Sequence, residues 1–197
     1  MRAQHPSILA GVLCSGVFDL RLERFSTGPW TERAATDFLL SEGRGRLMHD
    51  DYLAGHPADD PLVSPALADL GRLPPHFLQV SSAERLLDDS LILADRAARA
   101  GVHVELEVWP RMFHAWQVAA GFLPEATEAV TRSAAFIRRG EDRRRRRAGG
   151  RSRERGRGDQ RLTVVGRAEE PEPHRGSGSS VDLRAAAPDG QFTAQVK

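Results

Sequence analysis

The sequence predicts an α/β protein built around a parallel sheet, followed by a disordered arginine-rich tail. A nearly unbroken apolar run at residues 7–20, SILAGVLCSGVFDL, is typical of a strand buried on both faces. Strand and helix patterns then alternate over residues 76–138, as they do in right-handed strand–helix–strand units. Beyond Arg139 apolar residues become sparse and arginine dominates, which predicts that the folded part ends there.

The first predicted strand lies within residues 7–20 and carries one charged residue, Asp19, near its carboxyl end. Open α/β sheets place their functional groups at this end of their strands, although capping of the following turn is the favoured explanation of Asp19. Cys14 lies inside the run and is expected to be a small core residue. Residues 21–55 show helical spacing broken by glycines, with short helices expected from Thr31 and over residues 47–53. This segment is expected to form a surface excursion or a pocket wall rather than core.

The next part of the chain supplies the remaining elements of the sheet. Residues 56–75 contain five prolines and form an extended connector, because proline interrupts helices and strands. A short strand is predicted over residues 76–80 and a helix over residues 88–100, which Gly101 ends. Alternating apolar residues predict another strand over 102–109, and a final amphipathic helix is predicted over 124–138.

The charge distribution divides the chain into two predicted regions. Residues 1–139 contain 14 arginines and 18 acidic residues, whereas residues 140–197 contain 14 basic and 9 acidic residues. The second region cannot bury enough apolar surface to offset the entropy lost on ordering. We therefore expect a folded domain over residues 1–139 and a disordered basic tail over residues 140–197.

Cysteine content and hydropathy indicate the compartment. Cys14 is the single cysteine, which excludes an internal disulfide and fits a reducing environment. Apolar runs stay well below the roughly 18 residues that a membrane span requires. The first residues lack the order of basic, apolar and small residues that defines a signal peptide. These features predict a soluble, cytoplasmic protein without a membrane span.

Two titratable residues follow directly after predicted strands. Glu84 lies just past the strand at 76–80, and His114 lies just past the strand at 102–109, in the segment WPRMFHAW. A histidine needs little tuning to act as a general base near neutral pH, and a carboxylate on its other nitrogen would set its tautomer. Asp88 is the second choice for the acid, because it and Asp89 begin a helix and can be explained by interaction with the helix terminus.

A nucleophile is harder to assign. A serine on a strained strand-to-helix turn needs glycines around it, and no serine of the sequence has glycine at both −2 and +2. Ser15 lies beside Gly16 but no helix is predicted to follow it, and Ser177 and Ser179 fall in the predicted tail. Cys14 lacks an activating partner, so a core role is expected for it.

Several segments taken together resemble one known family. SGVFDL, DDYLAGHPADDPLVSPALADLGRLPP and FLQVSSAERLLDDSLILADRAARAGVHVELEVWPRMFHAWQ resemble the C-terminal half of the hormone-sensitive-lipase-like α/β hydrolases, the α/β hydrolase fold-3 carboxylesterases. The resemblance covers about residues 7–139 and implies a partial α/β-hydrolase fold, with parallel strands and flanking helices. It further implies that Glu84 is the catalytic acid and His114 the base. Its substrates would be esters with short to medium acyl chains, hydrolysed without a metal or an organic cofactor.

The sequence departs from the family in its nucleophile. Family members carry an oxyanion loop and a serine elbow upstream of the strand that resembles residues 7–20, and neither motif occurs in these 197 residues. We therefore expect an N-terminally truncated esterase that is inactive alone, or one complemented by a separate chain that supplies the serine. An exposed edge of the first strand would then allow oligomerisation.

The alternative function is a non-catalytic interaction protein whose arginine-rich tail binds nucleic acid through phosphate charge. The tail has few stacking aromatic residues and its acidic residues dilute the positive charge, so we expect a solvated tail rather than a nucleic-acid partner.

Overall fold

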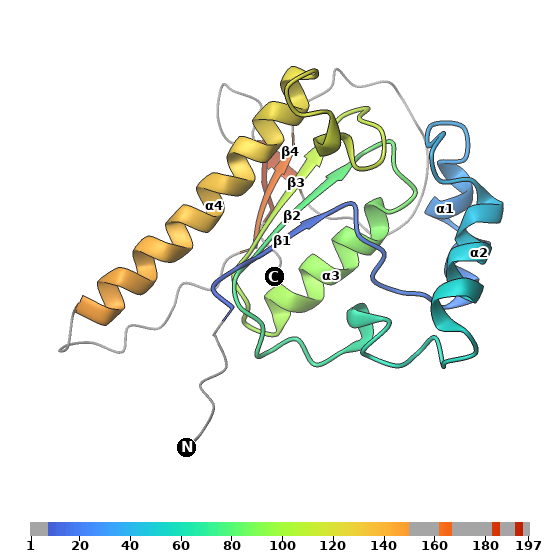
Figure 1. The fold of residues 1–197 in the computed structure, drawn as a ribbon, viewed down its shortest axis with the longest axis horizontal. Helices are drawn as coiled ribbons and strands as arrows, with labels where there is room; N and C mark the ends of the chain where they lie inside the picture. Colours follow the sequence, from blue (N-terminus) through green and yellow to red (C-terminus); the bar gives the residue numbers. More distant parts are fainter. Residues whose placement is uncertain (1–7, 150–161, 167–182, 186–191, 195–197) are drawn as a thin grey trace.

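The computed structural model describes residues 8–149, 162–166, 183–185 and 192–194. Its centre is a parallel sheet of four strands in the order β1-β2-β3-β4 (Figure 1). The strands are β1 (Gly11–Cys14), β2 (His76–Ser81), β3 (Val104–Trp109) and β4 (Leu162–Gly166), and a separate antiparallel pair joins β5 (Leu183–Ala185) to β6 (Phe192–Ala194). The α/β fold predicted from the sequence is confirmed.

Two helices cover opposite faces of the sheet. These are α3 (Leu87–Arg99) and α4 (Pro124–Gly149), which lie on different sides of the strands in Figure 1. Leu78 of β2 packs into the cluster that includes the buried face of α3, whereas its neighbour Phe77 stacks on Phe136 of α4 with ring centroids 5.4 Å apart. Because successive strand residues point to opposite faces, β2 contacts both helices and lies at the centre of the core.

The crossover from β2 through α3 to β3 follows from its sequence pattern. Acidic residues occupy the first turn of α3 and arginines its last turn, as the helix dipole favours. Leu93, Ala94 and Ala97 are buried against the sheet, and burying a leucine contributes about 2 kcal/mol. Gly101 then adopts φ +85°, a left-handed conformation that ends the helix and turns the chain into β3.

The first strand is shorter than the apolar run predicted. It ends at Cys14 because Ser15 takes φ +49°, which turns the backbone out of the strand direction. The following backbone N–H groups of Phe18 and Asp19 donate to the carboxylate of Asp89 instead of to a neighbouring strand. Cys14 is exposed rather than buried, because β1 lies at one edge of the described sheet. The expectation of a core cysteine is therefore wrong.

The segment between β1 and β2 forms a hydrophobic cluster of its own, whereas a surface excursion or a pocket wall rather than core was expected. Phe25 and Trp30 are buried edge to face, with ring centroids 4.8 Å apart, and pack with Leu20 and Leu86. The segment contains short helical elements: η1 (Leu22–Phe25), α1 (Pro29–Glu32), α2 (Glu42–Leu53) and η2 (Pro65–Leu67).

The last helix extends past its predicted end at residue 138 and past the predicted domain boundary at residue 139. Continuation to Gly149 is favoured by the arginine, glutamate and alanine residues of this stretch, which are good helix formers. Arg139 also ties the helix to β3 through an ion pair of 2.7 Å with Glu105. The residues of β4 belong to the predicted tail and pair with β3, whereas most of the tail lies outside the described residues, where disorder stays a prediction.

In the part of the chain that the structure describes, every helix is too short or too polar to cross a membrane.

Candidate active site

Three loops at the carboxyl ends of adjacent strands bring three polar side chains together. Ser15 follows β1 directly, Glu84 lies in the loop between β2 and α3, and His114 lies in the loop after β3. The parallel order β1-β2-β3 places all three loops at the same edge of the sheet, where α/β proteins bind ligands.

Glu84 and His114 form the pair that the sequence predicted. The Nδ1 atom of His114 lies 2.9 Å from Oε2 of Glu84. The glutamate side chain is only 1% exposed, whereas 25% of the histidine side chain is accessible. A buried carboxylate bonded to Nδ1 fixes the ring orientation and favours the tautomer with its proton on Nδ1. The unprotonated Nε2 atom is then available to accept a proton from a reacting group.

The second carboxylate oxygen of Glu84 is held by two donors. Its Oε1 atom accepts the backbone N–H of Ser81 at 2.9 Å and the hydroxyl of Ser15 at 2.8 Å. Burying a charge without partners is costly, and three hydrogen bonds, counting the one to His114, offset this cost. The sequence did not indicate either donor, although the position of Ser15 at a strand end was a signal that could have pointed to it.

The rival acids have other partners. Asp88 forms a half-buried ion pair of 3.7 Å with Arg33. Asp89 does not cap its own helix as predicted, because its Oδ1 atom accepts the backbone N–H groups of Phe18 at 3.0 Å and Asp19 at 3.2 Å. Burial raises the pKa of the Asp89 carboxyl above its usual range, despite these bonds. Both side chains therefore organise the surrounding structure.

Asp19 has the capping role that the sequence offered as one alternative. Its Oδ1 atom accepts the backbone N–H of Arg21 at 3.2 Å, and its Oδ2 atom pairs with the guanidinium of the same arginine at 2.7 Å. Burial alone would raise the pKa of Asp19, but the hydrogen bonds and charges of Arg21, together with the charge of Arg24, outweigh it and lower that pKa. Asp19 is therefore a charged anchor of the turn.

Cys14 is poorly suited to nucleophilic attack. Although Cys14 is exposed at the edge of the sheet, partial burial of its thiol and, to a smaller extent, the negative charge of Glu84 raise the pKa of that thiol. The thiolate is the reactive form of cysteine, so a raised pKa leaves the side chain protonated and weakly reactive near neutral pH.

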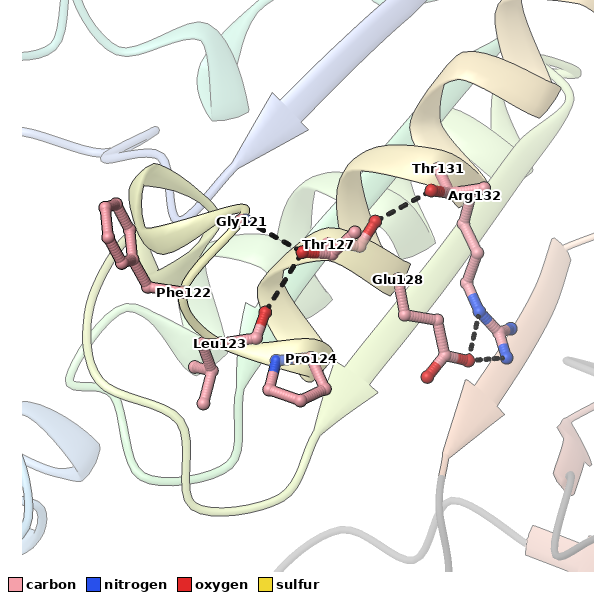
Figure 2. Close-up of a pocket in the computed structure, with 8 residues that line it drawn as sticks. All are labelled: Gly121, Phe122, Leu123, Pro124, Thr127, Glu128, Thr131 and Arg132. Atoms are coloured by element: carbon pink, nitrogen blue, oxygen red, sulfur yellow. Dashed lines mark hydrogen bonds and ion pairs between the residues drawn. The ribbon is translucent and has the colours of Figure 1, made fainter.

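A surface pocket of about 600 Å³ lies at the first turns of α4. Figure 2 shows its lining, in which Glu128 pairs with Arg132 and the ring of Phe122 extends away from the helix. Neither Glu84 nor His114 lines this pocket. Among the residues that the structure describes, no group of three His, Cys, Asp or Glu side chains is arranged to hold a metal ion.

Comparison with known proteins places the chain in a family. A family model described as α/β hydrolase fold, of the fold-3 group, matches residues 1–118. An acetyl-hydrolase from Streptomyces hygroscopicus is 41% identical over 133 residues, which are 68% of this chain and 44% of that protein. An esterase from Acinetobacter venetianus is 37% identical over 97 residues, which are 49% of this chain and 31% of that protein.

Solved structures agree with these relatives. The crystal structure of an esterase from the bacterial hormone-sensitive lipase family superposes with a TM-score of 0.63 at 39% identity, covering 70% of this chain and 45% of that one. A hormone-sensitive lipase from a metagenome library gives a TM-score of 0.64 at 34% identity, with the same coverage. The chain spans less than half the length of these relatives. By sequence and fold it belongs to the α/β hydrolase fold-3 family of carboxylesterase-type hydrolases.

Proposed function

We propose that this chain supplies the acid and the base of a carboxylic ester hydrolase, with Glu84 as the acid and His114 as the base. The observation that carries the proposal is the 2.9 Å contact between Nδ1 of His114 and Oε2 of Glu84, formed by a fully buried carboxylate and a partly accessible ring. The small-molecule substrate would be an ester, as the names of the relatives suggest.

The proposed reaction follows the order of a serine hydrolase. The Nε2 atom of His114 takes the proton of a serine hydroxyl as its oxygen attacks the ester carbonyl, and Glu84 stabilises the imidazolium that forms. His114 then returns the proton to the departing alcohol, which leaves an acyl-serine. In the second half, His114 deprotonates a water molecule that attacks the acyl group, and the carboxylic acid and the free serine are released.

The nucleophilic serine of this proposal comes from outside the 197 residues, because no serine here occupies a G-x-S-x-G elbow. Within the described sheet, β1 pairs only with β2, which leaves one edge of β1 open to a further strand. Val118 and Phe122, in and just after the loop that carries His114, are 82% and 95% exposed. A serine-bearing segment could cover these apolar side chains and the open edge.

A cytoplasmic location, inferred from the single cysteine, is also part of the proposal.

The first experiment uses the purified chain alone. It should neither hydrolyse p-nitrophenyl butyrate above a boiled control nor react with a fluorophosphonate probe for activated serines. Turnover together with a labelled serine would show that one of its own serines is the nucleophile, and this part of the proposal would be wrong.

The second experiment tests the acid and the base in a chimaera. The 133 matched residues of the Streptomyces acetyl-hydrolase are replaced by the corresponding residues of this chain. The chimaera should hydrolyse p-nitrophenyl esters, and His114→Ala should lower kcat by at least about 10³-fold. Glu84→Gln should lower kcat strongly as well, because an amide no longer favours the Nδ1–H tautomer.

His56→Ala provides the matched control for these variants. His56 also contacts a carboxylate, Asp60 at 2.7 Å, but the pair lies on the surface in the connector before β2. Its loss should leave turnover within about twofold, since it removes only an exposed ion pair. A folded His114→Ala chimaera with activity equal to that of the His56→Ala control would disprove the role of His114.

A further inference from the structure

Ser15 lies where the first strand, the acid and the base meet. Resting on the proposed function, we propose that Ser15 is a positioning residue, whose hydroxyl fixes the carboxylate of Glu84 in the orientation that holds His114. It would act through Glu84 and would not touch the substrate.

The hydrogen bonds of Ser15 connect two loops. Its hydroxyl donates to Oε1 of Glu84 at 2.8 Å and accepts the backbone N–H of Ala115 at 3.4 Å. Ala115 directly follows the base, so one hydroxyl connects the acid with the loop that carries His114. The residue is 5% exposed, and bulk water has little access to replace these bonds.

A carboxylate needs such a contact because its last torsion is soft. The χ3 angle of glutamate is broad and roughly two-fold, so one bond through Oε2 leaves the plane of the carboxylate poorly defined. The backbone N–H of Ser81 provides one donor to Oε1, and the hydroxyl of Ser15 provides the second. With both donors in place, Oε2 stays directed at Nδ1 of His114.

The backbone of Ser15 is held in a conformation that serine rarely adopts. Its φ of +49° lies in the left-handed region, which is disfavoured for residues with a Cβ atom. Its own N–H donates to the carbonyl of Gln79 on β2 at 2.9 Å, which anchors the turn to the sheet. This turn places the Ser15 hydroxyl against Glu84, where it is engaged with the acid and not with the base.

The experiment measures the tautomer of His114 in the full chain by nitrogen-15 NMR of labelled histidine rings. The ring signals are assigned with a His114→Asn variant. In the wild-type protein the neutral ring should carry its proton on Nδ1. In Ser15→Ala and in Ser15→Gly the ratio of the Nδ1–H to the Nε2–H tautomer should fall by about fivefold, the factor for one typical hydrogen bond.

Two comparisons separate positioning from stability. Ser15→Gly removes the hydroxyl but also relieves the strain at positive φ, so it keeps the test valid should Ser15→Ala fail to fold. Ser64→Ala removes another buried hydroxyl, which accepts from Leu20 N–H at 2.8 Å and donates to the carbonyl of Ala58. It should lower stability without changing the tautomer ratio of His114.

The proposal is overturned if both Ser15 variants keep the wild-type tautomer ratio, or if the ring of the wild-type protein carries its proton on Nε2. It is also overturned if the ratio falls in Ser15→Ala but has the wild-type value in Ser15→Gly, because backbone strain and not the hydroxyl would then explain the change. In an active chimaera, Ser15→Ala should lower kcat about fivefold while KM stays within twofold. The two proposals fail differently: retained activity in His114→Ala refutes the base, whereas an unchanged tautomer refutes only the role of Ser15.

Discussion

Replacement of Asp89 by alanine and by asparagine should have very different effects, because the two substitutions remove different parts of one buried contact. The Oδ1 atom of Asp89 accepts the backbone N–H groups of Phe18 and Asp19, across a separation of about 70 residues. Its Oδ2 atom lies 3.4 Å from the guanidinium of Arg24. Asp89 therefore holds the turn that follows Ser15 against the start of α3.

Alanine leaves both backbone donors without their acceptor. Each unsatisfied buried group costs about 1–3 kcal/mol of stability. Alanine also removes the cost of burying the Asp89 charge, which offsets part of this loss. We expect Asp89→Ala to lower the free energy of unfolding by about 3 kcal/mol. Asparagine keeps an acceptor oxygen for both N–H groups and removes the charge, so its cost should be about 1 kcal/mol or less.

The pH dependence provides a second signature. The pKa of Asp89 is raised by burial, so the folded protein binds this proton more tightly than the unfolded chain, whose aspartates titrate near ~3.9. The contribution of Asp89 to stability is therefore complete below the unfolded pKa and declines as pH rises through the folded pKa. Asparagine does not titrate, so Asp89→Asn should gain stability relative to the wild type between about pH 4 and pH 7.

Urea unfolding followed by circular dichroism at these two pH values measures both effects. Equal destabilisation by alanine and asparagine would show that the two backbone bonds contribute little. The opposite result would be a free energy of unfolding that rises with pH more in the wild type than in Asp89→Asn. It would show that the buried carboxylate stabilises the fold as an ion, in contradiction to the raised pKa.

Three further predictions concern the core, an ion pair and the cysteine. Phe136→Ala should cost about 3–5 kcal/mol in urea unfolding, because Phe136 is 2% exposed and stacks on the central strand. Arg139→Ala should cost less than about 1 kcal/mol at neutral pH, since the arginine is 48% exposed. Burial alone would raise the pKa of Glu105, but the hydrogen bond with His103 and the positive neighbours, Arg139 among them, outweigh it and lower that pKa. The stabilisation from these partners is present above the unfolded pKa and is lost as the pH falls through the folded pKa. The destabilisation by Arg139→Ala should therefore vanish as acid titrates Glu105. Cys14 should react with iodoacetamide more slowly than a peptide cysteine, and Glu84→Gln should accelerate the reaction by removing the negative charge that raises the thiol pKa.

The contact between Glu84 and His114, the proposed acid and base, could be predicted because the positions of both residues depend on local signals. Glu84 and His114 each follow a strand whose apolar pattern is clear, and parallel strands bring such residues to one edge. The same reasoning overestimated the first strand, because a continuous apolar run does not show where the backbone turns. The positive φ of Ser15 depends on hydrogen bonds to residues far along the chain, so no local sequence pattern predicts it.

Long-range pairing also explains the other differences. Asp89 looked like a helix cap because its neighbours in sequence suggested one, yet its partners lie on the segment after β1. Phe25 and Trp30 belong to a segment that was expected to form a surface excursion or a pocket wall rather than core, but they bury one another and pack in a cluster with Leu86. Sequence periodicity detects burial against a regular partner and misses burial among irregular loops.

The contact between the proposed acid and base is complete within a chain that has no elbow serine, and this separates two requirements of the proposed catalysis. The three groups that contact the Glu84 carboxylate, from Ser15, Ser81 and His114, lie at or just after the ends of three adjacent strands of this chain. The ring of His114, the proposed base, is therefore oriented without any nucleophile, as preorganised sites require. What a serine-bearing segment must add is one hydroxyl within hydrogen-bond reach of Nε2 and the donors for an oxyanion. An inactive but folded chimaera would accordingly indicate a misplaced serine, while the tautomer of His114 would still report a correctly formed pair.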